Sequence, residues 1–407
     1  MSDVLVLGGA AGPASGHVHD ICLRSLRQLV GRGCRVVLTD TPENLRAGAE
    51  IAALAHEVAA LDPTDPGACL AWIRARPDRG RFRAVFGYRE FAQVAVAEVA
   101  AELGLPGNPP DAVRTVRNKD ECRERLAAEG FRQPACRLVR TEAEGLDVLA
   151  SLGGTAIVKP RGAAGSTGVS LVTSAGDLPA AFAAASGEDG AAVVEAFVSG
   201  PEFSVEGIWL AGEPRVLAVT EKRTDTGSFV ESGHLMPARL DPGPAAAITA
   251  EVTAALLALK LSTGLFHVEC WLTEDGPVLG EVHVRQGGDW IHAMLEWCRP
   301  GLELYGAWYD DMTGRPVRLP EQVRAAATRF VMPPAGVVTS VTGWEAVDRE
   351  PDVLAAACTL TPGEAVRPAA RSGDRRGLLV VGGPDAPAAD RRAGELLARL
   401  RVAVRPA

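Results

Sequence analysis

The chain has 407 residues, 47% hydrophobic and 23% charged, which is ordinary for a globular protein of two or three domains. Its 42 basic and 51 acidic side chains give a net charge of −9 without a long basic run, which argues against a nucleic-acid or anionic-membrane surface. Eight scattered cysteines without C-x-x-C spacing indicate reduced thiols and argue against a zinc site.

The first segment, MSDVLVLGGAAG, starts as a strand and has no basic stretch followed by a cleavable apolar one, so a cytoplasmic protein is expected. Strands VLVLGG, RVVLTD and RAVFGY alternate with helical segments such as HDICLRSLRQLVGRG. This alternation predicts a parallel α/β domain over residues 1–112, which closes at the turn-rich GLPGNPP.

Residues 113–192 are expected to form a small domain with a glycine-rich flap. Its first helix, KDECRERLAAE, follows Asn118, which stands at capping-box spacing from Glu121, and Gly130 stops the helix. Residues 193–407 read as a larger domain, with antiparallel strands in SGPEFSVEGIWL and EPRVLAVTEK. The apolar helix AAAITAEVTAALLALKL carries Glu251 and Lys260, which argues against a membrane span. Short strands and an amphipathic helix, DRRAGELLARLR, end the chain.

Acidic and imidazole side chains alternate along the predicted hairpin GLFHVECWL–TEDG–PVLGEVHVR. A three-residue loop at 274–276 would place Glu269 opposite Glu281 and His267 opposite His283, on one face. Two facing carboxylates repel unless a cation lies between them, and Mg²⁺ prefers such oxygen ligands. The alternative is an exposed face with ordinary charges, which the apolar intervening residues disfavour.

The loop in IVKPRGAAGSTGV joins two apolar strands. Lys159 ends the first strand, three glycines let backbone N–H groups approach a phosphate, and Ser166 and Thr167 add hydroxyl donors. Because a strand follows rather than a helix, the loop is a flap and not a P-loop. A flexible hairpin without a ligand is the alternative.

Two further segments carry grouped polar residues. In VVEAFVSGPEFSVE, Glu195 and Glu202 flank a turn, where backbone groups could meet a flat heterocycle and a carboxylate could accept from ribose; two solvated glutamates are the alternative. The stretch 221–240 reads as a long polar loop, either a lid or disordered, with candidate ligands Lys222, Arg223, Glu231 and His234.

Taken in order, these motifs resemble the ATP-grasp superfamily over most of the chain. The order is Lys119 before a helix, Lys159 before the flap, Glu195 to Glu202, then Glu269 to Glu281 with Arg285. Within the superfamily, SFVESGHLMPA together with GLFHVEC and GEVHVRQGGD looks most like L-amino-acid ligases and related carboxylate–amine ligases. The resemblance implies an α/β (α+β) ATP-grasp fold with a parallel N-terminal domain, a small flap domain and a larger antiparallel domain.

The resemblance also implies a role for each motif. Catalysis would fall to Arg285, Lys159 and His234. ATP would be held by Lys119, Lys159, Ser166, Thr167, Glu195, the Phe197–Val198 backbone and Glu202; Mg²⁺ by Glu269, Glu281 and His283; and the substrate by Glu231, His234, Arg285, Gly287 and Gly288.

One position departs from the family pattern Glu-x-Asn-x-Arg, because this chain has Glu281-x-His283-x-Arg285. Mg²⁺ prefers oxygen to imidazole, so three interpretations stay open: His283 favours Mn²⁺, acts through water, or lies outside the metal shell.

The implied reaction is ATP-dependent amide or dipeptide formation from small carboxylate and amine substrates through an acyl phosphate, with release of ADP and phosphate. A homodimer is the implied assembly. Two alternatives stay open: a ligase that loads an amino acid onto a carrier protein, and a nucleotide-binding regulatory protein without turnover.

Overall fold

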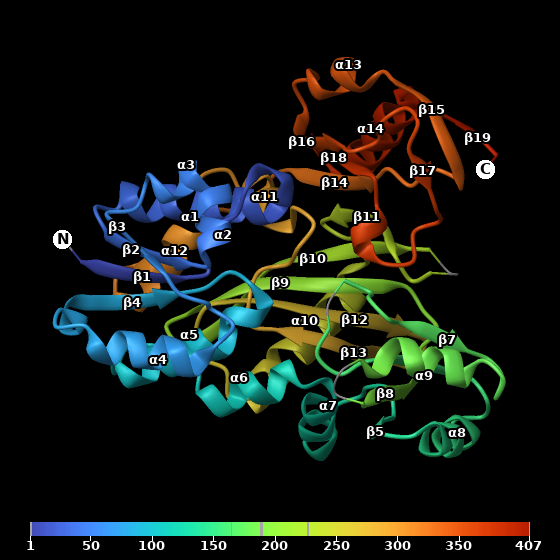
Figure 1. The fold of residues 1–407 in the computed structure, drawn as a ribbon, viewed down its shortest axis with the longest axis horizontal. Helices are drawn as coiled ribbons and strands as arrows, with labels where there is room; N and C mark the ends of the chain where they lie inside the picture. The colour runs from blue at the N-terminus through green and yellow to red at the C-terminus, as the bar shows by residue number, and fades with distance from the viewer. Residues whose placement is uncertain (1, 164, 188–189, 226–227, 407) are drawn as a thin grey trace.

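The computed structural model describes residues 2–163, 165–187, 190–225 and 228–406, and its strands form four sheets (Figure 1). A parallel sheet lies near the N-terminus, a small antiparallel sheet and a large antiparallel sheet follow, and a three-stranded sheet lies near the C-terminus. This arrangement matches the expected parallel N-terminal, small and larger antiparallel parts.

The N-terminal sheet is parallel, in the order β3-β2-β1-β4. Alternate residues of β1 pack against helices on its two faces, Val4 and Val6 in one core and Leu5 and Leu7 in another, so the strand is buried throughout and apolar after Asp3. The elements of this part are β1 Asp3–Leu7, α1 His17–Gly31, β2 Arg35–Asp40, α2 Pro42–Ala47, α3 Ala49–Ala52, β3 Glu57–Ala60, α4 Pro66–Ala75, β4 Phe82–Phe86 and α5 Gln93–Glu102, with 3-10 turns η1 Pro13–Ser15, η2 Arg79–Arg81 and η3 Glu90–Ala92.

Two helices, α6 Pro110–Arg117 and α7 Lys119–Ala128, lead to the small sheet, whose order is β5-β8-β6-β7. The predicted start of α7 is confirmed, but the capping box is not formed: Asn118 Nδ2 donates to Glu121 Oε1 at 3.0 Å instead of capping the backbone. The elements are β5 Cys136–Val139, α8 Glu142–Ser151, β6 Ala156–Pro160, β7 Ser170–Val172, α9 Leu178–Ser186 and β8 Ala192–Ala196.

The glycine-rich segment joins β6 to β7, which pair antiparallel as the sequence predicted. The predicted boundary after residue 192 falls within β8, although β8 pairs with β5 and β6 of the small sheet. We therefore propose that the small domain ends after Ala196.

The large sheet is antiparallel throughout, in the order β13-β12-β9-β10-β11-β14-β18-β16. Helix α10 packs its apolar side on one face of β9, β12 and β13, while α11 and α12 lie beside the N-terminal sheet (Figure 1). The elements are β9 Glu202–Leu210, β10 Glu213–Thr224, β11 Glu231–Met236, α10 Pro242–Ala258, β12 Leu265–Thr273, β13 Gly276–His283, α11 Ile291–Cys298, α12 Leu304–Met312, β14 Ala325–Phe330, β16 Val353–Cys358 and β18 Gly377–Gly383.

The C-terminal region extends this sheet and adds another. Its strands β14, β16 and β18 form the far edge of the large sheet, and α14 packs on β14 and β18. The remaining elements are β15 Gly336–Thr342, α13 Trp344–Asp348, β17 Ala365–Val366, η4 Ser372–Asp374, α14 Ala386–Arg399 and β19 Arg401–Arg405, with sheet order β17-β15-β19.

The prediction of one long loop over 221–240 is wrong. β10 continues to Thr224, and β11 pairs with it so that Lys222 lies opposite His234. The segment is polar because these strands send side chains into a cleft, and strand formation does not require apolar residues on such a face. Among the described residues, no helix combines the length and apolarity that a membrane crossing requires.

The predicted three-residue loop of the β12–β13 hairpin is also wrong. Thr273 pairs with Gly276, which leaves two residues in the loop. The pairing then shifts at a bulge between Val268 and Cys270, and beyond it His267 faces His283 as predicted. A side chain on Gly280 would meet the Glu269 carbonyl at 2.8 Å, so the bulge requires glycine there.

Candidate active site

A cleft of about 980 Å³ lies over the polar face of the large sheet, and every residue to which the resemblance gave a role lines it. Arg223, a further candidate ligand, does not line it and pairs with Asp390 at 2.6 Å. The small sheet, the N-terminal domain and the C-terminal region also contribute to its walls. Segments as far apart in the sequence as Ala14 and Leu378 therefore meet in one space large enough for a nucleotide and a second substrate.

Five neighbouring strands form the floor of this cleft, and each contributes a polar side chain. In sheet order they are Glu281 on β13, Glu269 on β12, Glu202 on β9, Lys222 on β10 and His234 on β11. Because side chains alternate across a strand, the intervening residues Val268 and Val282 point into the core under α10. This alternation explains why a buried strand carries polar side chains at every second position.

Lys222 joins three of the predicted acidic residues. Its Nζ lies 2.5 Å from Glu202 Oε1, 2.7 Å from Glu269 Oε1 and 3.5 Å from Glu231 Oε1. Burial alone lowers the pKa of this ammonium, but the surrounding carboxylates raise it well above its ordinary value, so Lys222 is charged. Burial also raises the pKa of Glu202, although the charge of Lys222 acts to lower it.

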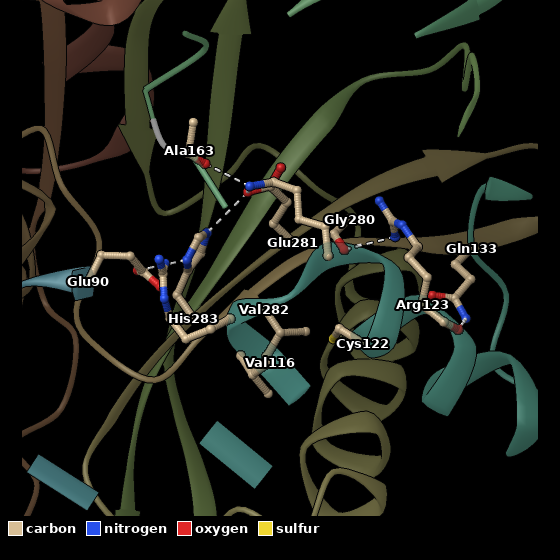
Figure 2. Close-up of a pocket in the computed structure, with 12 residues that line it drawn as sticks. Glu90, Val116, Cys122, Arg123, Gln133, Ala163, Gly280, Glu281, Val282 and His283 are labelled. Atoms are coloured by element: carbon tan, nitrogen blue, oxygen red, sulfur yellow. Dashed lines mark hydrogen bonds and ion pairs between the residues drawn. The ribbon is translucent and has the colours of Figure 1, made fainter. Parts of the chain in front are cut away.

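A second cluster surrounds Lys159. Its Nζ lies 2.7 Å from Glu195 Oε1 and 3.2 Å from Glu281 Oε1, and Arg123 Nη2 lies 3.1 Å from Glu195 Oε2. Arg123 also donates to the carbonyls of Leu279 and Gly280, which fixes α7 against β13 (Figure 2). No sequence pattern points to Arg123, whose side-chain partners lie 72 and more residues away.

Lys119 lies at the start of α7 and contacts both the flap and the sheet. Its Nζ donates to the Ala163 carbonyl at 2.7 Å and lies 3.5 Å from Glu281 Oε2. Burial raises the pKa of Glu281, but Lys119 and Lys159 oppose this effect and lower it to about 2. Glu281 is therefore an anion at neutral pH with two cations beside it.

Glu90, from the N-terminal domain, orients two of the predicted residues. Its carboxylate lies 2.9 Å from His283 Nδ1 (Figure 2). It also accepts from Arg285 Nε at 2.5 Å and from Arg117 Nη1 at 2.7 Å. Burial raises the pKa of Glu90, yet Arg285, His283 and Arg117 together lower it well below its ordinary value. Sequence reasoning missed Glu90, although it follows strand β4 at the carboxyl end of the parallel sheet, where ligands usually bind.

The far end of the cleft is closed by the C-terminal region. Arg375 binds both oxygens of Asp289 at 2.6 and 2.8 Å, and His234 Nε2 lies 3.2 Å from the same carboxylate. Ser372 Oγ donates to Glu231 Oε2 at 3.0 Å, and the Ser372 backbone N–H donates to the flap carbonyl of Gly165 at 3.0 Å. Arg375 and Ser372 had no sequence signal, because only tertiary packing brings them to Asp289 and Glu231.

Two histidines near the cleft have opposite charge states. Burial lowers the pKa of His17 to about 4, so this side chain is neutral near neutral pH. Burial also lowers the pKa of His267, but Glu206, 2.8 Å from its Nδ1, raises it to about 9. His267 is therefore a cation beside Glu269.

The acids of the floor are held by ammonium groups in this structure. In the part of the chain that the structure describes, no three His, Cys, Asp or Glu side chains are grouped closely enough to hold a metal ion. The donor chemistry still fits a divalent cation, because Glu269 and Glu281 lie on paired strands and face the same cleft. His283 adds a nitrogen donor beside Glu281, at 3.6 Å.

Three family models match consecutive parts of the chain. They are the ATP-grasp N-terminal domain over residues 31–107, the ATP-grasp domain over residues 153–294, and the L-amino acid ligase C-terminal domain 2 over residues 329–405. The ATP-grasp match includes Lys159, Lys222, Glu269, Glu281 and His283. Arg375 lies in the C-terminal match.

Relatives and solved structures agree with these matches. The uncharacterized protein y4rH of Sinorhizobium fredii is 27% identical over 84% of this chain and 72% of its own length. The D-alanine–D-alanine ligase of Mycobacterium bovis is 32% identical over 42% of this chain, and the match spans half of that ligase. The crystal structure of the L-amino acid ligase from Bacillus licheniformis has the same fold, with a TM-score of 0.78, 22% identity, and coverage of 100% of this chain and 99% of that one.

Fold, family models and relatives thus agree with the expectation drawn from the sequence. An ATP-grasp fold is confirmed, and the named relative is a ligase, the expected enzyme class. The chain belongs to the ATP-grasp superfamily, and its C-terminal region matches that of the L-amino acid ligases.

Proposed function

We propose that this protein is an ATP-dependent ligase that joins a small carboxylate, such as an amino acid, to an amine and releases ADP and phosphate. The observation that carries the proposal is the convergence of Glu269, Glu281, Lys159, Lys119 and Arg285 on one cleft. This combination places two cation-binding carboxylates beside three groups that bind anions, as transfer of a phosphoryl group requires.

The nucleotide end of the cleft lies between the flap and the large sheet. Lys119 and Lys159 bind phosphates, with Ser166 and Thr167 above them in the flap. The backbone at Phe197 and Val198 holds the adenine. The Glu195 carboxylate already accepts from Lys159 and Arg123, so its contribution is to fix Lys159. Glu202 binds the ribose once Lys222 turns toward the phosphates.

Glu269 and Glu281 would hold the divalent cation, Mg²⁺ or Mn²⁺, which would supply charge neutralisation at the transferred phosphoryl group. In the nucleotide complex, Lys159 and Lys222 would pair with the phosphates instead of with these carboxylates. The exchange keeps the buried charges balanced, because each displaced ammonium gains an anionic partner.

Amide formation needs activation, because a carboxylate is a poor electrophile. A carboxylate oxygen of the substrate attacks the γ-phosphorus of ATP, the bond to the β,γ-bridging oxygen breaks, and ADP leaves. The neutral amine then attacks the acyl carbon, phosphate departs with the carbon–oxygen bonding electrons, and the amine loses a proton. Arg285 stabilises the phosphoryl group and the oxyanion; its Nη2 has no hydrogen-bond partner in the described part of the chain.

The amino-acid end of the cleft contains Glu231, His234 and the backbone of Gly287 and Gly288. Glu231 would accept from the substrate ammonium, and His234 would fix the neighbouring loop through Asp289. The flap and the Ser372 segment already touch, so closure there excludes the water that would hydrolyse an acyl phosphate. A homodimer and a cytoplasmic location stay predictions.

The test is ADP and phosphate release with pairs of amino acids, with mass analysis of the products. Amino-acid-dependent ADP release with a new amide mass is expected, and Glu281→Gln should reduce it at least 100-fold. Glu221→Gln is the matched control, because Glu221 lies on the same sheet but binds Arg239 outside the cleft. ATP binding without ADP release would favour a regulatory protein, and release only with a carrier protein would favour carrier loading.

A further inference from the structure

The β12–β13 hairpin carries the same pair of residues twice. His267 and Glu269 lie two positions apart on β12, and Glu281 and His283 lie two positions apart on β13. The two rings face each other with centroids 5.6 Å apart. Each imidazole turns Nε2 to the glutamate of its own strand, at 3.5 Å for Glu269 and 3.6 Å for Glu281.

The second nitrogen of each ring is held by a buried carboxylate from another element. Glu90 lies 2.9 Å from His283 Nδ1, and Glu206 lies 2.8 Å from His267 Nδ1. The surroundings of these two carboxylates differ. Glu90 also accepts from Arg117 and Arg285, whereas Glu206 otherwise accepts from the hydroxyls of Ser204 and Thr220.

The two carboxylates therefore support their imidazoles differently. The charge of Glu90 is matched by two guanidinium groups, so Glu90 serves His283 as an acceptor for Nδ1–H and leaves Nε2 as a donor atom directed at Glu281 (Figure 2). Glu206 makes an ion pair with His267 and with no other described residue. A carboxylate behind the far nitrogen is the usual support of a metal-bound histidine.

We infer that His283 is a nitrogen ligand of the cation held by Glu281 and Glu269, that Glu90 is its positioning residue, and that the site consequently prefers Mn²⁺ to Mg²⁺. The inference rests on the proposed function, which places the cation on these two glutamates. Mg²⁺ demands oxygen ligands in near-ideal octahedral geometry, while the larger and softer Mn²⁺, which also takes carboxylate oxygen, accepts an imidazole nitrogen more readily than Mg²⁺ does.

The test uses the full chain with Mn²⁺ and ADP and measures electron spin echo modulation, which detects nitrogen bound to Mn²⁺ without turnover. We expect ¹⁴N modulation in the unmodified chain that changes to the ¹⁵N pattern when the protein is labelled with ¹⁵N-histidine. His283→Asn should abolish it, whereas the matched variant His267→Asn should retain it. The isotope experiment needs no substitution, so it stays decisive even if a variant fails to fold.

Metal competition supplies a second measurement. In the ADP complex, the Mg²⁺ concentration that displaces half of the bound Mn²⁺ should be about tenfold lower for His283→Asn than for the unmodified chain. Glu90→Gln should also lower this concentration. Bound Mn²⁺ without histidine modulation, or modulation that survives His283→Asn, would overturn the inference but leave the ligase proposal intact. Failure of Mn²⁺ to bind with nucleotide overturns both, and nitrogen ligation without ligase activity overturns the proposed function alone.

Discussion

Lys222→Met removes a buried ammonium that contacts three carboxylates. Its closest contact with Glu269 is 2.7 Å, at which a unit pair attracts by roughly 6 kcal/mol for an effective dielectric constant near 20. Part of that attraction only offsets the desolvation of the charges. Removal of one partner from a buried cluster typically costs about 3–5 kcal/mol, and we expect that loss at pH 8 in the absence of metal.

Calorimetry of the metal-free chain measures the effect. A loss of 3–5 kcal/mol corresponds to a drop of roughly 6–20 °C in the melting temperature of a domain of this size. The drop should be smaller at pH 5, because burial raises the pKa of the unpaired carboxylates and the folded variant then binds protons that the unfolded chain does not. Saturating Mn²⁺ or Mg²⁺ should restore part of the melting temperature, since a divalent cation replaces the ammonium.

Lys260→Met is the control, because Lys260 is exposed and makes no ion pair with the described residues. It should melt within about 1 °C of the unmodified chain. If Lys222→Met also melts within that range at pH 8, the three carboxylates do not depend on Lys222, and the assignment of the floor as a cation-binding cluster is wrong.

Two further outcomes concern the cleft. Arg285→Ala should leave ADP affinity within about threefold but reduce product formation at least 100-fold, since the guanidinium acts on the transferred group; unchanged ligation in a coupled assay would contradict this role. In NMR titrations, the His17 ring should stay neutral down to about pH 4 and the His267 ring charged up to about pH 9. The folded-state pKa of His267 lies above its ordinary value, so the stabilisation from its charged form is complete below about pH 6.5 and is lost as the pH rises through about 9. The difference in melting temperature between the unmodified chain and His267→Gln, measured across this pH range, tests that expectation.

Local patterns were enough to predict much of the fold. Alternation of Glu281, His283 and Arg285 with apolar residues marked one face of a strand, and the apolar strands beside the glycines marked the flap. Alternation repeats every two residues, so it predicts the face of a side chain but not the bulge at Glu269. The pairing of His267 with His283 is nevertheless the predicted one, because two differences from the prediction cancel. The loop is one residue shorter than predicted, and the bulge adds one residue to β13.

The residues that orient the site could not be predicted in this way. Glu90 accepts from Arg285, 195 residues away, Arg123 binds Glu195, 72 residues away, and Arg375 binds Asp289, 86 residues away. Neighbouring residues carry no trace of those contacts. The polar strand β11 was mistaken for a loop because its hydrophilic residues face a cleft formed by other domains. Sequence patterns reveal which groups are present, whereas their charge partners depend on packing.

The distribution of lysine makes this cleft unusually easy to observe. Among 42 basic residues only four are lysines, and three of these, Lys119, Lys159 and Lys222, line the cleft. Reductive alkylation with ¹³C-formaldehyde would thus install methyl probes almost solely at the nucleotide end, with Lys260 as a solvent reference. Lys222, engaged by three carboxylates, should resist alkylation until a divalent cation displaces it, so the extent of labelling would itself report the loading of the site.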